Sequence, residues 1–265
     1  MLWYIQVVIM LVKENNIENF SSYEFEFLKV KIHDNYLEII LNRPEKKNAL
    51  NPKMIKELAI CSDYANHTDK IRAVIYKSTG DTFCAGLDLK ELSDGKIFLA
   101  DIFNKLHKPK IAVIDGNVHA GGVLIVSCVN YVICTPNIKM TLPEVKRGLF
   151  PYQVMDSLFR IIPEKKALDW CMRGYSIDSS ECKELNLVQE VCNNDEIETK
   201  LRHIIDEISL GSPNAIKKAL KVFEEIYIKD NIIKKLNNAL DELKKSDDVI
   251  EGVKAFKEKR LPKWK

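Results

Sequence analysis

The chain has 265 residues, of which 46% are hydrophobic and 29% are charged, so it is long enough to bury a large core. Forty basic residues nearly balance thirty-eight acidic ones, and the net charge of +2 lacks the strong basic excess of a dedicated nucleic-acid-binding protein. The seven cysteines are scattered and form no CxxC pair. This pattern argues against a disulfide framework or a zinc site and predicts free thiols in a reducing, cytoplasmic location.

The first predicted segment is an N-terminal extension over residues 1–24. It begins with MLWYIQVVIMLV, an apolar run too short to span a bilayer, which takes about 20 residues. The segment also lacks the basic start and the small-residue cleavage site of a secretory signal. We therefore expect either an additional strand or a true start at Met10, and no association with a membrane.

Residues 25–140 alternate between strand and helix patterns. Two short strands over 25–32 and 36–41 meet at a polar turn and predict a β-hairpin. The following helix is expected to begin at Pro52, with Asn51 as its N-cap. The next predicted elements are a strand over 72–79, a helix that begins near Asp88, a helix over 97–107 and a strand over 110–115. This alternation predicts an α/β fold with parallel crossover connections.

Helix patterns dominate the second half of the chain. A helix over 164–173 ends at Gly174, and a capping box between Asp178 and Glu181 starts another. Beyond residue 195 the sequence is helical and rich in lysine. The predicted organisation is an N-terminal extension over 1–24, an α/β core over 25–195 and a helical C-terminal region over 196–265.

Two segments share a strand–turn–helix design with glycine at the turn, TFCAGLDLKEL (82–92) and NVHAGGVLIV (117–126). Gly86 permits a tight turn in the first, and Gly121 and Gly122 open a helix in the second. Backbone N–H groups on two such turns can converge on one oxygen atom, and the helix adds its positive dipole end. Either segment alone is equally consistent with tight packing.

Five stretches together resemble the crotonase (enoyl-CoA hydratase/isomerase) superfamily in order and spacing. They are LNRPEKKNAL (41–50), FCAGLDLKEL (83–92), KPKIAVIDGNVHAGG (108–122), LPEVKRGLF (142–150) and ALDWCMRGYSIDSSECKELNLVQEV (167–191). The resemblance runs from about residue 25 to the end of the chain. It implies an α/β fold, a spiral of ββα units with a helical C-terminal trimerisation region. It also implies an acyl-CoA substrate, no separate cofactor or metal, and a homotrimer or a dimer of trimers.

The resemblance assigns an oxyanion hole to the backbone N–H groups of Leu87 and Gly121. These groups would hold the thioester oxygen of an acyl-CoA as it becomes an enolate, and one such donor is worth about 3 kcal/mol of transition-state stabilisation. Hydratases of the family use two glutamates, and the matching positions here are Leu124 and Glu144. The chain therefore keeps one acid/base residue and has a hydrocarbon in place of the other.

A single carboxylate favours isomerisation over hydration. Hydration needs a positioned water, and Leu124 gives that water no hydrogen-bond partner. Glu144 alone can remove a proton from one carbon and return it two carbons away, which moves a β,γ double bond to the α,β position, as in the enoyl-CoA isomerases. An apolar pocket would raise its pKa toward neutrality. Hydration, acyl-CoA hydrolysis and decarboxylation stay as alternatives. Without the resemblance, Glu144 reads as a helix-start residue or an ion-pair partner of Lys146 or Arg147.

Several neighbouring residues have two interpretations. The bulky segment that contains Phe150 replaces a glycine-rich stretch of the hydratases, and we expect it to reshape the acyl pocket. His119 either lines that pocket or packs locally. Cys84 lacks a nearby His–acid pattern, so we interpret it as a small buried residue rather than a nucleophile. Asp88 is expected to cap the start of a helix.

The resemblance places the coenzyme A contacts on two loops and near the C-terminus, at Lys46, Lys47, Ala49, Ala85, Gly86, Phe256 and Lys259. Lys46 or Lys47 either pairs with a phosphate group or is a solvated loop residue.

The alternative from another class is a binding protein without catalysis, which binds CoA esters or RNA. One branch of the family binds RNA through a lysine-rich helix, and residues 215–236 are rich in lysine. Glu224, Glu225 and Asp230 interrupt that stretch, which favours a solvated helix face. We therefore expect no nucleic-acid partner.

Overall fold

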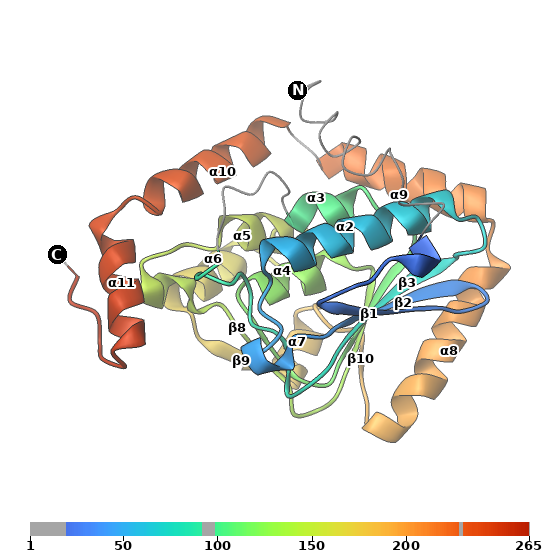
Figure 1. The fold of residues 1–265 in the computed structure, drawn as a ribbon, viewed down its shortest axis with the longest axis horizontal. Helices are drawn as coiled ribbons and strands as arrows, with labels where there is room; N and C mark the ends of the chain where they lie inside the picture. Colours follow the sequence, from blue (N-terminus) through green and yellow to red (C-terminus); the bar gives the residue numbers. More distant parts are fainter. Residues whose placement is uncertain (1–19, 92–98, 228–229, 265) are drawn as a thin grey trace.

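The computed structural model describes residues 20–91, 99–227 and 230–264, so most of the predicted N-terminal extension lies outside the described residues. The larger of its sheets has the strand order β1-β2-β3-β5-β7-β10. Its strands are β1 (Leu28–Ile32), β2 (Tyr36–Leu41), β3 (Ala73–Ser78), β5 (Lys110–Ile114), β7 (Tyr131–Cys134) and β10 (Glu190–Val191). β1 and β2 form the predicted antiparallel hairpin, and the other pairs are parallel (Figure 1).

A second sheet has the order β4-β6-β8-β9. Its strands are β4 (Thr82–Cys84), β6 (Asn117–His119), β8 (Lys139–Thr141) and β9 (Ser176–Asp178). After β3, β5 and β7 in turn, the chain passes into this second sheet. The next helices are α3 (Leu99–Asn104), α4 (Gly121–Cys128) and the 3-10 helix η3 (Pro143–Arg147). The repeated unit of two strands and a helix confirms the predicted α/β fold of ββα units.

The remaining helices are η1 (Phe20–Ser22), η2 (Pro44–Lys46), α2 (Pro52–His67), α5 (Tyr152–Leu158), α6 (Glu164–Arg173), α7 (Ser179–Glu184), α8 (Asn194–Leu210), α9 (Pro213–Tyr227), α10 (Asp230–Leu243) and α11 (Asp247–Lys257). Local signals set several of these ends as predicted. The Asn51 side chain accepts a hydrogen bond from the Met54 N–H at 2.8 Å at the start of α2. Gly174 ends α6 in a left-handed conformation, with φ 59°.

The larger sheet is buried on both faces. Along β3, Val74 and Tyr76 face the main apolar cluster, whereas Ala73 and Ile75 face a smaller one. The smaller cluster is closed by side chains of α8, namely Ile197, Leu201, Ile204 and Ile205. Burial on both faces explains why a strand such as β5, KIAVI, is nearly all apolar rather than alternating.

Two helix predictions differ from the structure. The helix predicted to begin near Asp88 is wrong within the described residues, because residues 88–91 form a turn in which the Asp88 carboxylate binds Arg43. The helix predicted over 97–107 is shorter and spans Leu99–Asn104, and residues 92–98 lie outside the described ranges.

The first described residues pack on the core, and the last helix, α11, packs on η3. Phe20 is buried and stacks on Tyr64 with ring centroids 3.8 Å apart, so the described part of the predicted extension packs on the core. α11 lies at the opposite end of the molecule from α8 and packs against η3 (Figure 1). The predicted division at residue 195 stays a prediction. Within the described ranges, no helix combines the length and the apolar character that crossing a membrane requires.

Candidate active site

The two glycine turns lie side by side because β4 and β6 are neighbouring parallel strands. A Cβ atom added to Gly86 would lie 2.9 Å from the Gly121 nitrogen, and one added to Gly121 would lie 3.6 Å from the Leu87 nitrogen. The amides of Leu87 and Gly121 therefore border one small space. This proximity is what the predicted oxyanion hole requires.

The backbone orientation of Leu87 follows from its bridge to Leu50. The Leu50 N–H donates to the Gly86 oxygen at 2.8 Å, and the Asp88 N–H donates to the Leu50 oxygen at 2.9 Å. The residue between two such bonds directs its own N–H to the opposite side of its chain. Among the backbone hydrogen bonds of turns, loops and helix caps in the described residues, none has the N–H of Leu87 or Gly121 as its donor.

The adjacent glycines at the start of α4 meet different demands. A Cβ atom on Gly122 would lie 2.6 Å from the Cys84 oxygen, so close packing explains this glycine. A Cβ atom on Gly121 would meet nothing closer than 3.4 Å, so packing does not explain it. The first turn of α4 has no acidic side chain that would offset the positive end of the helix dipole at Gly121.

Glu144 lies on η3, just after β8. The Ala120 N–H donates to the Thr141 oxygen at 2.9 Å, so β8 runs beside the residue that precedes Gly121. The Glu144 Oε2 atom is buried and has no hydrogen-bond partner among the described residues. Burial raises the pKa of Glu144 to about 7, against the opposing effects of a backbone hydrogen bond and of Arg147. A carboxyl group with this pKa can take up and release a proton near neutral pH.

Of the two structural interpretations of Glu144, the helix-start position is present, because Glu144 is the second residue of η3, whereas the ion pair is not. Within the described chain no ion pair of 4.0 Å or less joins its carboxylate to Lys146 or Arg147, and the Lys146 Nζ instead donates to the Gly174 oxygen at 2.8 Å. The Arg147 guanidinium lies 4.3 Å from the centroid of the Phe256 ring on α11. A Cβ atom on Gly252 would lie 2.3 Å from the Arg147 carbonyl carbon, so α11 packs directly on the turn that carries Glu144.

The predicted pocket residues differ in polarity. Burial, followed by the charges of Lys47 and Arg147, lowers the pKa of His119, so its half-buried imidazole is neutral at neutral pH. Leu124 lies one turn after Gly121 on α4 and is 2% exposed. Phe150 is half-buried and packs against the main apolar cluster. Leu124, which matches the position of the second glutamate of hydratases, thus adds no polar atom to the predicted pocket.

Cys84 is buried, as predicted. Burial raises the pKa of its thiol to about 12, and its Sγ accepts a hydrogen bond from the Gly86 N–H at 3.4 Å. The group therefore stays a neutral thiol, which is a poor nucleophile.

Most of the predicted coenzyme A contacts lie on two connected loops. The Ala85 N–H donates to the Lys47 oxygen at 3.0 Å, which joins the loop after β2 to the turn at Gly86. Lys46 and Lys47 are exposed on that loop, and Ala49 is half-buried in it. Phe256 lies on α11, against Arg147. Lys259 is exposed just beyond that helix, and no ion pair or hydrogen bond of the described chain joins it to the loop.

Arg43 is a buried residue that the sequence reasoning missed. Its side chain is 4% exposed, its Nη1 donates to Asp88 Oδ2 at 2.7 Å, and its Nη2 donates to Glu91 Oε1 at 2.7 Å. Asp88 is therefore not the predicted helix cap. Burial opposes its ionisation, yet hydrogen bonds from Arg43 and the Lys90 N–H bring the pKa of Asp88 below its usual value. The sequence indicates this buried ion pair only through an arginine in LNRPEKKNAL and two acidic residues, Asp88 and Glu91, in FCAGLDLKEL.

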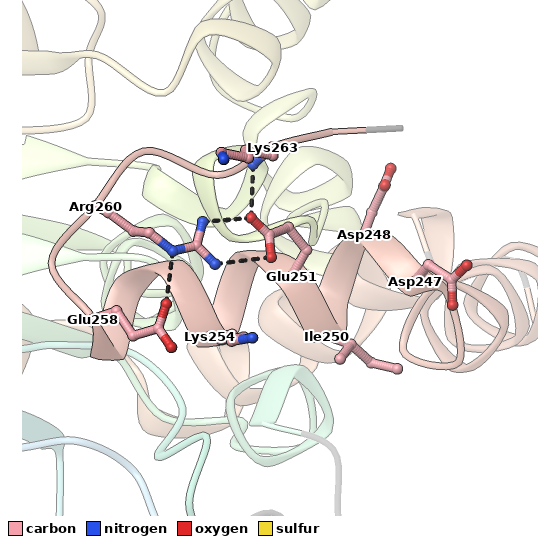
Figure 2. Close-up of a pocket in the computed structure, with 8 residues that line it drawn as sticks. All are labelled: Asp247, Asp248, Ile250, Glu251, Lys254, Glu258, Arg260 and Lys263. Carbon is pink, nitrogen blue, oxygen red and sulfur yellow. Dashed lines mark hydrogen bonds and ion pairs between the residues drawn. The ribbon is translucent and has the colours of Figure 1, made fainter.

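A separate hollow of about 470 Å³ lies at α11 and the chain end (Figure 2). It is lined by Asp247, Asp248, Ile250, Glu251, Lys254, Glu258, Arg260 and Lys263. Arg260 donates to both oxygens of Glu251, at 2.6 and 3.0 Å, and Glu258 accepts from its Nε. Figure 2 draws these contacts as dashed lines. The charged groups at the centre of the hollow are thus paired with each other. None of the predicted catalytic residues lines this hollow.

Comparison with known proteins places this geometry in a family. The sequence model for "Enoyl-CoA hydratase/isomerase" matches residues 31–265. An enoyl-CoA hydratase of Mycobacterium tuberculosis is 30% identical over 86% of this chain and 92% of its own length. A carnitinyl-CoA dehydratase of Escherichia coli is 29% identical over 91% of this chain and 98% of its own length.

Solved structures agree with the sequence comparison. The crystal structure of an enoyl-CoA hydratase/isomerase from Pseudoalteromonas atlantica superposes with a TM-score of 0.82 at 26% identity, and covers 91% of this chain and 100% of its own. A carnitinyl-CoA hydratase from Mycobacterium avium gives a TM-score of 0.80 at 27% identity, with 90% and 98% covered. Fold, glycine turns and sequence thus agree, and the chain belongs to the enoyl-CoA hydratase/isomerase (crotonase) family of enzymes.

Proposed function

We propose that this enzyme moves the double bond of an enoyl-CoA thioester from the β,γ to the α,β position, with Glu144 as its single acid/base. One observation carries the proposal. The half-buried side chain of Glu144, with its Oε2 atom buried and its pKa raised to about 7, follows the strand beside the paired amides, while the buried Leu124 matches the position of the second glutamate.

The reaction needs only these groups. The Glu144 carboxylate removes a proton from the α carbon, and the electrons of that C–H bond delocalise over the double bond and the thioester carbonyl. The N–H groups of Leu87 and Gly121 hold the resulting negative charge on the carbonyl oxygen. Protonated Glu144 then returns the proton to the γ carbon. The double bond finishes in conjugation with the thioester, and no atom is gained or lost.

Several wider predictions go with this proposal. The substrate's coenzyme A portion is expected to contact Lys46, Lys47, Ala49, Ala85 and Gly86, with Phe256 and Lys259 nearby, and His119 and Phe150 are expected to border the acyl group. No cofactor beyond the substrate's own coenzyme A is proposed. We also propose a homotrimer or a dimer of trimers in the cytoplasm.

Hydration is the second candidate, because the printed names of the M. tuberculosis and E. coli relatives are those of a hydratase and a dehydratase. The two reactions are separated by giving the purified enzyme a β,γ-enoyl-CoA and an α,β-enoyl-CoA in separate assays. Isomerisation is expected to convert the first into a conjugated thioester of unchanged mass. Consumption of the second alone, with the mass of one water gained, would instead establish hydration.

The rate of isomerisation is expected to depend on pH through Glu144. Only the carboxylate form can accept the α proton, and burial raises the pKa of this group to about 7. The value of kcat/KM should therefore rise about tenfold per pH unit below pH 7 and level off above it. Initial rates measured across this range test the prediction, and a profile that is flat through pH 7 or falls with rising pH would contradict it.

A further inference from the structure

Arg43 joins the two loops that the proposed function assigns to coenzyme A and to the thioester oxygen. Its Nη1 donates to both the Ala49 oxygen, at 3.1 Å, and the Asp88 carboxylate, at 2.7 Å. Its Nη2 donates to Glu91, whose other carboxylate oxygen accepts from Asn51 Nδ2 at 2.9 Å. The Arg43 guanidinium therefore connects the loop after β2, which contains Ala49, to the turn after Gly86, which contains Asp88 and Glu91.

These contacts flank the bridge that orients the Leu87 amide. The bridge joins Leu50 to Leu87, and the Arg43 Nη1 binds the residue before Leu50 and the residue after Leu87. A change in the separation of Ala49 and Asp88 is therefore expected to turn the peptide that carries the Leu87 N–H. A planar guanidinium with its donors in a fixed fork sets this separation more strictly than a flexible ammonium can.

The loop that carries Arg43 is strained and held in place from several sides. Lys47 and Asn48 both have positive φ, 53° and 52°, a left-handed conformation that residues other than glycine adopt uncommonly. The fully buried Asn48 side chain accepts from the Arg43 N–H at 2.7 Å and donates to the Thr79 and Thr82 oxygens, each at 2.7 Å. Strain that is held this firmly points to a functional demand on the position of the loop.

We propose that Arg43, through Asp88 and Ala49, is a positioning residue that aims the Leu87 N–H at the thioester oxygen. The proposal rests on the proposed function, since it assigns the Leu87 amide to the oxyanion hole. Arg43 itself touches no reacting atom. A buried ion pair of this kind adds little net stability, whereas the direction of an oxyanion donor has a large effect on rate.

The test combines kinetics with the spectrum of a bound ligand. The variants are Arg43→Lys, Asp88→Asn and Glu91→Gln, with Arg173→Lys as the matched control, because Arg173 forms an exposed ion pair with Asp169 at 3.2 Å. The probe is a cinnamoyl-CoA with an electron-donating ring substituent, whose absorbance moves to longer wavelength when its carbonyl oxygen accepts hydrogen bonds.

Arg43→Lys and Asp88→Asn should lower kcat about 10- to 100-fold with little change in KM, since small misplacements of a catalytic group have effects of this size. Both should bind the probe with a smaller wavelength shift than the native enzyme. Glu91→Gln, at the more exposed end of the contact, should show a weaker effect in the same direction. Arg173→Lys should match the native enzyme in both measurements.

A native wavelength shift in both Arg43→Lys and Asp88→Asn would overturn the proposal, and so would loss of folding in both. The first result would show that the Leu87 N–H is oriented without the Arg43 contacts to Asp88 and Ala49. The second would show that these contacts serve the stability of the fold. Failure of the proposed function gives a different result, because the native enzyme itself would then shift the probe spectrum little and convert neither enoyl-CoA.

Discussion

Replacement of Glu144 by glutamine is expected to lower turnover by about 10²- to 10⁴-fold and to leave the affinity for a CoA ester nearly unchanged. The amide has nearly the shape of the carboxyl group but cannot accept the α proton. Steady-state kinetics and binding of an unreactive acyl-CoA, measured on the same preparation, separate the two effects. A non-catalytic CoA-ester binder would show no turnover in either form, and retained turnover in the variant would remove Glu144 from the mechanism.

The same substitution should stabilise the fold at alkaline pH. Burial raises the pKa of Glu144 from an ordinary 4.5 to about 7, so the folded state binds more protons than the unfolded state between these values. Its favourable contribution is complete below the unfolded pKa and is lost as the pH rises through 7. The difference of about 2.5 pKa units corresponds to roughly 3 kcal/mol at most.

Urea unfolding at two pH values measures this effect. At pH 8 the Glu144→Gln protein should be more stable than the native enzyme, and near pH 4 the two should differ little. Glu184→Gln, which changes an exposed carboxyl group, is the matched control and should leave the pH dependence as it is. A native stability that rises between pH 5 and pH 8 while the variant's does not would contradict the assigned burial of Glu144.

The fold was largely predictable because its signals are local or belong to a shared pattern. The hairpin before α2, the Asn51 cap and the end of α6 at Gly174 each depend on a few adjacent residues. The order of strands and helices repeats, and the resemblance supplied the rest of the topology. The helix expected near Asp88 failed because its partner, Arg43, lies 45 positions away. No local propensity records such a contact.

In the candidate site, too, some features were predictable from local motifs and others depend on three-dimensional packing. The glycine turns and Glu144 lie in motifs that can be read directly, whereas the different demands on Gly121 and Gly122 depend on what each glycine faces in three dimensions. The raised pKa of Glu144 likewise comes from burial by parts of the chain that the motif does not contain. Sequence reasoning therefore found which residues to consider, and the packing around them distinguishes those with a structural reason from those without one.

Gly121→Ala should abolish most of the activity and leave the fold intact. The added methyl group would lie 3.4 Å from Gly86 Cα and 3.6 Å from the Leu87 nitrogen, which are ordinary contacts, so the chain can accept it. Alanine also favours the first turn of a helix over glycine. The methyl group would nevertheless occupy the space between the two amides, where the thioester oxygen is proposed to bind. Loss of these donors predicts a fall in kcat/KM of about 10²- to 10³-fold.

Gly122→Ala is the matched control, since it adds the same methyl group one residue later. There the Cβ atom would lie 2.6 Å from the Cys84 oxygen, so this variant should lose stability, and any loss of activity should follow its loss of folded protein. Thermal unfolding and initial rates should be measured on both variants. Gly121→Ala should keep its unfolding temperature and lose activity, whereas Gly122→Ala should lose both together. Native activity in a folded Gly121→Ala protein would mean that no substrate oxygen enters the space between the amides, and the proposed chemistry would have no place in this structure.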